Sequence, residues 1–370
     1  MAAICVVAAA AAWVFAFKAS RRMPDFEVYW RAGARAAQAE PLYRADDAAY
    51  QFKYFPAFAV VAIPLGALPL PVAKPIWFTL SFAALVALLA LSVRILPDRR
   101  QPVGLLIAVL IVGLGKYYAK DLVLGQINLV FALVATAAIA AFKAGREALA
   151  GALVVFAIVL KPYALILLPW IAARRRAPSA IAAAAGIVLA AVLPAFIYGI
   201  DGTIGLYQGW WRTVTDTTAG TLTHSDNVSL AAMYTKWFGF GSVATVLAGV
   251  TAACLMAIAA VVFLRRRGLP SPDGLEAGLL LTLTPLLSPQ GWDYVVLVST
   301  PAIVYVANYF SELPRRLQPI AALAVAVIGL TLFDLLGRRL HYALMDLSVI
   351  TLAFLVIIAS LAVLRLHRTA

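Results

Sequence analysis

The sequence predicts an all-α, polytopic membrane protein. Of its 370 residues, 64% are hydrophobic and 13% are charged, whereas soluble globular domains have about 45–50% apolar and about 25% charged residues. Several apolar runs reach the roughly 18 residues that are needed to cross a bilayer core of about 30 Å. Lipid offers the backbone no hydrogen bonds, so these runs are expected to be helices. The composition excludes a soluble globular protein.

One membrane domain is expected over residues 1–370, as a bundle of about 10–12 transmembrane helices with interfacial helices on its outer side. The apolar blocks cover approximately 2–18, 54–71, 73–96, 102–118, 122–142, 147–172, 179–199, 241–264, 275–288, 292–310, 316–337 and 344–366. In two of them, proline is expected to break the helix. Block 54–71 is therefore expected not to cross fully, and block 147–172 is expected to form two short helices that meet at an outer Lys161-Pro162 turn.

The distribution of arginine predicts which loops share a side. Four clusters lie an even number of blocks apart, at 174–176, 265–267, 315–316 and 365–368. The positive-inside rule makes these clusters cytoplasmic, which places a first loop (19–53) and a second large loop (200–240) outside. Arg338 and Arg339 then lie outside, against the rule. The predicted location is the inner (plasma) membrane. The net charge of +13 is explained by cytoplasmic loops and anionic lipids, so no nucleic-acid partner is expected.

The first outer loop carries the most informative polar residues. Its apolar and aromatic residues recur at helical spacing and predict an amphipathic interfacial helix, formed by Phe26, Tyr29, Trp30, Gly33 and Ala37. Asp25 lies near the start of this helix, where the helix dipole favours an ionised carboxylate. It is either a general base or a helix cap. Glu27 follows two residues later, but two carboxylates alone are weak evidence for a divalent cation.

Polar residues at other outer helix ends are further candidates. Lys161 stands in an apolar segment, where a lysine either serves a function, such as holding a phosphate, or extends its ammonium group to the interface. Gln126 and Asn128 either bind a polar ligand or join helices by hydrogen bonds. His224 in the second loop is either a proton-transfer or phosphate contact or a solvated loop residue. Trp292 either stacks on a sugar or anchors at the interface.

Motifs of several enzyme classes are absent from the sequence. It has no Walker A loop, no GxGxxG after a strand, no HExxH, no GxSxG and no cluster with zinc-ligand spacing. Nucleotide-cofactor enzymes and metalloproteases lose support accordingly. No cofactor and no divalent metal are expected.

A series of motifs in one order resembles glycosyltransferase family 87. The motifs are DFEVYWRAG with PLY, FKYFPAFAVVAIPLGALPLPVA, GQINLV, LKPYALILLPW, DNVSL and LLSPQGWDY, between about residues 24 and 296. Members of this family are GT-C fold enzymes related to bacterial polyprenyl-phosphate-mannose-dependent α-mannosyltransferases. The resemblance implies an enzyme that transfers a sugar, mannose in its relatives, from a polyprenyl phosphate to a glycolipid or glycan hydroxyl at the outer face of the membrane.

The resemblance also implies roles for individual residues. The catalytic aspartate of the first outer loop maps to Asp25, which would deprotonate the acceptor hydroxyl and invert a β-linked donor. Cations would stabilise the phosphate leaving group, and the candidates are Lys161, Lys53, Arg31, Arg212 and His224. Candidates for contacts with the sugar or the acceptor are Glu27, Tyr29, Gln126, Asn128, Asn227, Trp292 and Asp293. Independence from metal is implied as well.

The sequence departs from the family pattern at one place and leaves two other function classes open. Relatives tend to carry histidine just after the Ser-Pro-x-x-Trp motif, where this chain has Asp293 and Tyr294, so either Asp293 or His224 would have to replace it. The first alternative is a lipid or solute transporter, although transporters commonly show inverted repeats with paired broken helices. The second alternative is a non-catalytic scaffold, in which Asp25 and Lys161 would have no special role.

Overall fold

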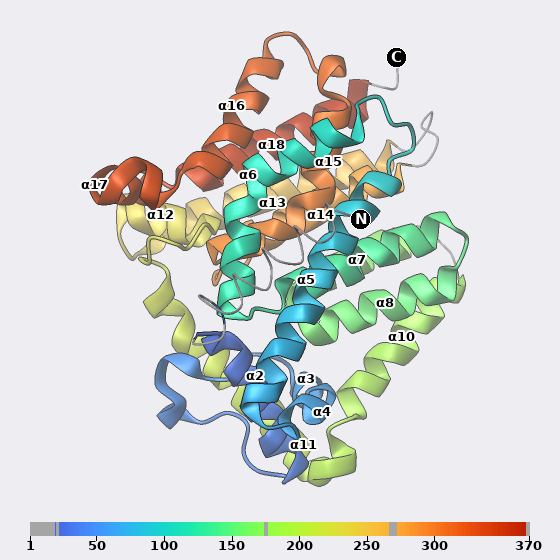
Figure 1. The fold of residues 1–370 in the computed structure, drawn as a ribbon, viewed down its shortest axis with the longest axis vertical. Coiled ribbons are helices and arrows are strands. Elements are labelled where there is room, and N and C mark those ends of the chain that lie inside the picture. The colour runs from blue at the N-terminus through green and yellow to red at the C-terminus, as the bar shows by residue number, and fades with distance from the viewer. Residues whose placement is uncertain (1–18, 20–21, 174–176, 266–271, 368–370) are drawn as a thin grey trace.

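The chain folds as a bundle of helices, as the composition predicts. The structure is a computed structural model that describes residues 19, 22–173, 177–265 and 272–367. Throughout these residues the regular secondary structure is helical, apart from one isolated antiparallel bridge between Asn227 and Trp292. Figure 1 shows α2 to α4 and α11 at one end of the long axis and α16 at the other. The predicted block 2–18 lies outside the described residues.

The helices of the first half follow the predicted blocks closely. They are α2 (Pro24–Ala37), η2 (Ala45–Tyr50), α3 (Pro56–Val61), α4 (Ile63–Gly66), α5 (Leu70–Arg94), α6 (Val103–Leu124), α7 (Asn128–Lys143), α8 (Glu147–Leu160), η3 (Pro162–Leu167), α9 (Leu168–Ala173), α10 (Ala177–Val192) and α11 (Ala195–Thr218). The two predicted helix breaks are confirmed. The block 54–71 forms only the short helices α3 and α4, and the block 147–172 breaks at Lys161, whose backbone is extended.

The second half contains the remaining helices. They are η4 (Ala219–Thr221), α12 (Leu230–Phe238), α13 (Ser242–Leu264), α14 (Asp273–Leu287), η5 (Asp293–Ser299), α15 (Thr300–Asn308), η6 (Phe310–Glu312), α16 (Leu317–Leu330), α17 (Phe333–Asp346) and α18 (Val349–His367). The expected loop 200–240 is wrong in one respect, because α11, η4 and α12 make most of it helical. The segment YQGWWRTVTDTT has few aliphatic residues, which is why it did not stand out as an apolar block.

Helix length separates full spans from broken ones. Among the described residues, α5, α6, α13 and α18 are long and apolar enough to cross a membrane. Two bent pairs of helices are also long and apolar enough when each pair is taken as one span. They are α10 with α11, bent by 83°, and α16 with α17, bent by 104°. The predicted polytopic bundle is thus confirmed with four to six such spans, and shorter apolar helices supply the other segments.

Contacts between helix ends sort the connections onto two faces. At one face, the Arg100 backbone N–H donates to Asn308 Oδ1 at 2.8 Å, and Lys143 donates to the carbonyl of Ile95. The 22-residue helix α6 leads from this face to the other one, about 33 Å away. The arginine clusters at 174–176 and 266–267 lie outside the described residues.

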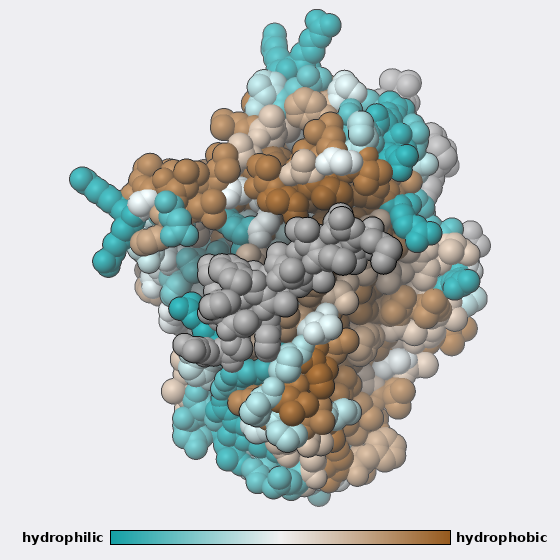
Figure 2. All heavy atoms as spheres, viewed as in Figure 1, coloured by the Kyte–Doolittle hydropathy of each residue, from teal (hydrophilic) through white to brown (hydrophobic). Residues whose placement is uncertain are grey.

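The opposite face gathers the segments that were expected to be outer. The N–H of Met23 donates to the carbonyl of Val123 at 3.2 Å, and Lys236 Nζ donates to the carbonyl of Met345 at 3.3 Å. On this side, hydrophilic atoms gather over the α2 and η2 region in Figure 2, and apolar atoms cover much of the neighbouring surface. Large apolar side chains on α10 are exposed, including Ile181 at 67% and Val188 at 63%. Such a surface suits contact with lipid.

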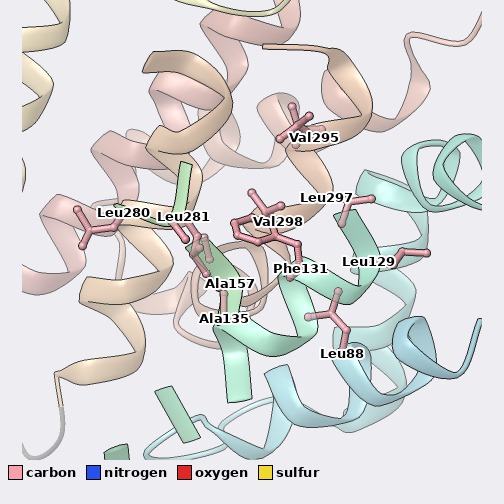
Figure 3. Close-up of a cluster of buried hydrophobic side chains, with 14 of the residues drawn as sticks. Leu88, Leu129, Phe131, Ala135, Ala157, Leu280, Leu281, Val295, Leu297 and Val298 are labelled. Carbon is pink, nitrogen blue, oxygen red and sulfur yellow. The ribbon is translucent and has the colours of Figure 1, made fainter. Parts of the chain in front are cut away.

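The core lies where α7, α8, α14 and η5 meet. Figure 3 shows Phe131 and Ala135 of α7 beside Ala157 of α8, with Val298 of η5 above them. These four side chains are fully buried at 0% exposure. Because α7 and η5 begin at the same face of the bundle as α2, this packing holds the starts of both helices in place beside α2.

A close crossing of α2 and α4 holds the first loop against the bundle. A Cβ atom at Gly33 would lie 2.2 Å from the carbonyl oxygen of Ala62, and one at Gly66 would lie 2.3 Å from the backbone nitrogen of Ala34. The apolar face of α2 therefore packs on protein, with Phe26 and Tyr29 buried.

Gly33→Ala should consequently destabilise the fold. Overpacking costs about 1–3 kcal/mol, so we expect the thermal midpoint in detergent to fall by several degrees. Gly104→Ala is the matched control, since no atom lies within 4 Å of the added Cβ there. An equal midpoint for the two variants would contradict the close crossing.

Candidate functional site

A cavity of about 300 Å³ opens between α2, the segment before α3, η3, α11 and the connection from α14 to η5. It brings together six of the residues predicted from the sequence, which are Asp25, Tyr29, Lys53, Gln126, Lys161 and Trp292. The aromatic residues Tyr54, Tyr163, Trp210 and Tyr294 complete much of the wall. The cavity thus combines one carboxylate with two ammonium groups among aromatic rings.

Local backbone features place Asp25 and Gln126 side by side. Pro24 occupies the first turn of α2, where its missing N–H costs nothing, and Asp25 follows it. Gly125 ends α6 with a positive φ of 71°, a conformation that glycine adopts without strain. This glycine packs against Phe26, and its carbonyl accepts a 2.9 Å hydrogen bond from Trp77 Nε1. The turn carries Gln126 to the start of α2.

A hydrogen-bonded network connects Gln126 to the cavity wall. Tyr29 donates its hydroxyl proton to Gln126 Oε1 at 3.0 Å, so the 2.7 Å contact between Tyr29 and Tyr54 has Tyr54 as its donor. Gln126 Nε2 donates to the Tyr294 hydroxyl at 3.1 Å. The same side chain is hydrogen-bonded to Asp25. Gln126 therefore orients the Asp25 carboxylate, and both the oxygen and the nitrogen of its amide already have hydrogen-bond partners in the protein.

Lys161 points a buried cation at the cavity. Only 7% of the residue is exposed. Its Nζ lies 4.9 Å from the centre of the Tyr54 ring and 5.6 Å from that of Tyr163. Within the described part of the chain, this ammonium group makes no hydrogen bond and no ion pair. Because an unpaired buried charge is costly, the arrangement favours an anionic ligand.

Lys53 is the second cation, and it acts on the same carboxylate. Burial lowers the pKa of Lys53, while the charge of Asp25 opposes that change. Burial raises the pKa of Asp25, against the lowering effects of the Gln126 hydrogen bond and of Lys161, Lys53 and Lys120. A carboxylate with a raised pKa is a stronger base than an exposed aspartate, which suits proton abstraction.

The wall formed by α11 was missed by the sequence reasoning. Trp210 Nε1 donates to the carbonyl of Lys53 at 3.2 Å. Gln290 Nε2 donates to Thr218 Oγ1 at 2.9 Å and so joins the connection after α14 to the end of α11. Tyr163 also went unrecognised, although its place two residues after Lys161 offered a signal.

Comparison with known proteins decides the class. The sequence profile of glycosyltransferase family 87 matches residues 52–289, which is more than half of the chain. The chain belongs to glycosyltransferase family 87. No curated protein and no solved structure matches it. The family 87 match includes Lys53, Gln126 and Lys161 of the cavity, whereas Asp25 precedes the matched range.

Family membership establishes a membrane glycosyltransferase, in place of the transporter and scaffold alternatives. Such an enzyme needs a sugar donor and an acceptor in contact with one site. In this family 87 chain, the cavity between α2, η3 and α11 is large enough and polar enough to be that site.

Three predicted residues of α2 and α11 lie away from the cavity. Glu27 forms an ion pair with Lys74 at 2.7 Å. Arg31 pairs with Asp47 at 3.2 Å. Arg212 is exposed on α11 and does not line the cavity. As placed here, these side chains are not positioned to touch a ligand inside it.

Two other predicted residues form a cluster beside the cavity. Lys120 Nζ lies 2.7 Å from Asp293 and 2.8 Å from Asp226, so one cation bridges two carboxylates. The ring of His224 stands edge-on to Trp292, with centroids 5.0 Å apart. This cluster joins the segment before α12 to the start of η5, and it supports Trp292 from outside the cavity.

The two predicted asparagines are buried in the framework around the site. Asn227 Nδ2 donates to the carbonyl of Pro289 at 2.8 Å, and its Oδ1 accepts from the N–H of Ser229 at 3.0 Å. Asn128 Nδ2 donates to Asp121 Oδ2 at 2.8 Å. Both asparagines thus hold backbone or neighbouring side chains in position.

An ion pair holds η2, which contributes Ala49 and Tyr50 to the cavity wall. Asp47 of η2 accepts hydrogen bonds from Arg35 at 2.5 and 2.8 Å. The Arg35 hydrogen bonds hold the pKa of Asp47 below its usual range, against the effect of burial. The stabilisation of the folded protein by this ion pair is therefore complete above the pH range in which an ordinary aspartate titrates. It is lost as the pH falls through the lowered pKa of Asp47.

Asp47→Asn should loosen the attachment of η2. An ion pair that is partly exposed contributes about 1 kcal/mol, so local opening should increase about fivefold. We expect trypsin to cleave after Arg44 or Lys53 about five times faster. The control is Asp46→Asn, since Asp46 is exposed one residue earlier. Equal cleavage of both variants would show that the ion pair does not hold the segment.

Proposed function

We propose that this family 87 enzyme transfers a sugar, mannose in the first instance, from a polyprenyl-phosphate donor to a hydroxyl group of a lipid-linked or glycan acceptor. The bond from the anomeric carbon to the phosphate oxygen breaks, and a bond to the acceptor oxygen forms with inversion. Asp25 takes the acceptor proton, and polyprenyl phosphate leaves with one more negative charge than it had in the donor. We place the site at the periplasmic or exterior face of an inner (plasma) membrane.

One observation carries the proposal. The cavity holds a single carboxylate, Asp25, together with the ammonium groups of Lys53 and Lys161, neither of which is paired within the described residues. This set has a net positive charge and suits a phosphodiester. As the leaving group gains charge, fixed cations beside it stabilise the transition state. The two lysines would supply the charge that a divalent metal supplies in other enzymes, so no metal is required.

The acceptor would approach Asp25 along the aromatic side of the cavity. Trp292 and Tyr294 are stacked, with an interplanar angle of 10°, and both line the cavity. Flat aromatic faces and a few hydrogen-bonding groups are the usual means of holding a sugar ring. Gln126, which is itself held by Tyr29, would orient the Asp25 carboxylate, while Asp293, Asn128 and Asn227 would support this wall from behind.

The pH dependence of the transfer follows from the raised pKa of Asp25. The enzyme needs the ionised carboxylate, so the rate should fall as the pH drops through this pKa. Because burial raises the pKa, the acid limb of kcat/KM should lie above the ordinary aspartate range. A rate that is unchanged down to the ordinary range would contradict Asp25 as the base.

The stereochemistry of the product tests the proposal directly. Purified enzyme would be given polyprenyl-phosphate β-mannose and membrane glycolipids, and the product would be digested with an α-mannosidase. Complete release of the transferred mannose supports single displacement with inversion. Product that resists the α-mannosidase but yields to a β-mannosidase would exclude this mechanism. Corresponding glucose and arabinose donors would identify the sugar.

A further inference from the structure

A second hollow lies beside the cavity on the lipid-facing side of the bundle. It has a volume of about 170 Å³ and lies between α3, α8, η3, α10 and α11. The residues that line it are all apolar or aromatic, including Phe55, Val159, Leu165, Ile187 and Ala190. The one hydroxyl among them, that of Tyr207, is already bonded to the carbonyl of Ala191 at 3.2 Å. This apolar groove therefore offers no hydrogen bond to a ligand and suits hydrocarbon.

The apolar groove and the cavity adjoin each other at two places. Phe55 lines the groove and Trp210 lines the cavity, and their ring centroids are 4.6 Å apart. Pro162 lines the cavity, and Leu165 lines the groove three residues later on η3. One turn of a 3₁₀ helix rises about 6 Å, so the groove begins about one turn from Pro162, the residue after Lys161.

Bilayer lipid has access to the groove along α10. Leu165 is 45% exposed, and Val188 and Leu189 beside the groove are 63% and 61% exposed. A molecule with a charged head and a hydrocarbon tail would therefore meet, in order, an unpaired ammonium group and an apolar groove. A tail that continued past the groove would enter the membrane without crossing the protein.

We propose that the apolar groove holds the first isoprene units of the donor's polyprenyl tail while Lys161 and Lys53 hold its phosphate. This inference rests on the proposed function and adds to it the path of the lipid, which enters between η3 and α10. The acceptor then approaches from the opposite side of the cavity, past Trp292. An acyl chain of bulk phospholipid is the competing occupant, and the experiments below distinguish the two.

The test compares two ligands that share a phosphate head. Geranyl phosphate has two isoprene units, whereas methyl phosphate has none, and the binding of each to purified protein would be measured in one detergent. Ala190→Trp fills the groove. Ala185→Trp is the matched control, because Ala185 lies on the exposed side of α10 and does not line the groove. Each buried methylene group favours binding, so the loss of contact with one isoprene unit should lower the binding affinity at least about tenfold.

We expect Ala190→Trp to weaken binding of geranyl phosphate at least about tenfold and to change that of methyl phosphate less than about twofold. Ala185→Trp should leave both unchanged. Equal binding of geranyl and methyl phosphate by the wild type would overturn the groove while leaving the phosphate site intact. If neither ligand binds, the proposed phosphate site itself fails. An Ala190→Trp protein that binds geranyl phosphate like the wild type also overturns the groove.

A labelling experiment with the wild type keeps the inference testable if Ala190→Trp does not fold. Geranyl phosphate with a diazirine on its first isoprene unit should label peptides that contain η3 or α10, and excess unlabelled geranyl phosphate should suppress the labelling. Labelling of η3 or α10 that is suppressed by phosphatidylcholine but not by geranyl phosphate would assign the groove to a bulk acyl chain. Labelling confined to α5 or α6 would place the tail elsewhere.

Discussion

Asp25→Asn is expected to lower kcat by about 10²- to 10⁴-fold, the usual contribution of a positioned general base. Asparagine keeps the shape of the side chain and its hydrogen bond with Gln126. It cannot take up the proton of the acceptor's hydroxyl group. Removing a partly buried carboxylate should not reduce folding, because burial already disfavours its charged form. Initial rates with purified protein, matched by gel filtration profile and thermal midpoint, would measure the effect.

Glu27→Gln is the matched control for this substitution. It removes a carboxylate from the same helix two residues later, but Glu27 is paired with Lys74 outside the cavity. We expect its kcat to stay within about threefold of the wild type, since a surface ion pair contributes little. Equal losses of kcat in Asp25→Asn and Glu27→Gln would mean that kcat depends on the charge of α2 and not on a base in the cavity.

Lys161→Met is expected to lower kcat by about 10²- to 10³-fold, similar to the loss of one preorganised group that stabilises transition-state charge. Methionine preserves most of the volume and removes an unpaired buried cation, so the protein should fold at least as well as the wild type. Because the charge of Lys161 lowers the pKa of Asp25, the acid limb of the pH profile should also move to higher pH. A role in packing alone would not produce this second change.

The control for Lys161 lies at the other face of the bundle. Lys143 donates to the carbonyl of Ile95 there, so Lys143→Met removes a cation that is far from the cavity. We expect this variant to keep its rate and its pH profile within error. If Lys161→Met kept full activity, the phosphate would have to be held by other groups, and the assignment of the cavity would lose its main support.

The fold and part of the site could be predicted from periodicity and proline positions. Apolar block length alone located α5, α6, α13 and α18, because a bilayer demands long apolar helices. Lys161 was recognisable from the sequence, since a lysine beside proline in an apolar segment is costly without a function. Asp25 was recognisable from its place at the start of an amphipathic helix and from the family motif around it.

The rest depended on contacts that are distant in the sequence. The second half of α11 appeared as part of a loop, because apolar residues are sparse in YQGWWRTVTDTT and because the helix is placed by packing against α3. Nothing in the local sequence shows that Trp210 meets Phe55, or that Gln126 reaches α2 through the left-handed turn at Gly125. Arg31 and Asn227 were chosen by residue type, whereas the structure uses them in an ion pair and in backbone hydrogen bonds.

The central claim is that a polyprenyl-phosphate sugar is the donor for the cavity with Asp25 and Lys161. The most direct measurement gives one preparation of purified enzyme two donors in parallel, radiolabelled polyprenyl-phosphate mannose and the corresponding nucleotide sugar, with the same glycolipid acceptor. We predict transfer from the lipid-linked donor alone, and inhibition of that transfer by added polyprenyl phosphate. Transfer from the nucleotide sugar alone would contradict the account.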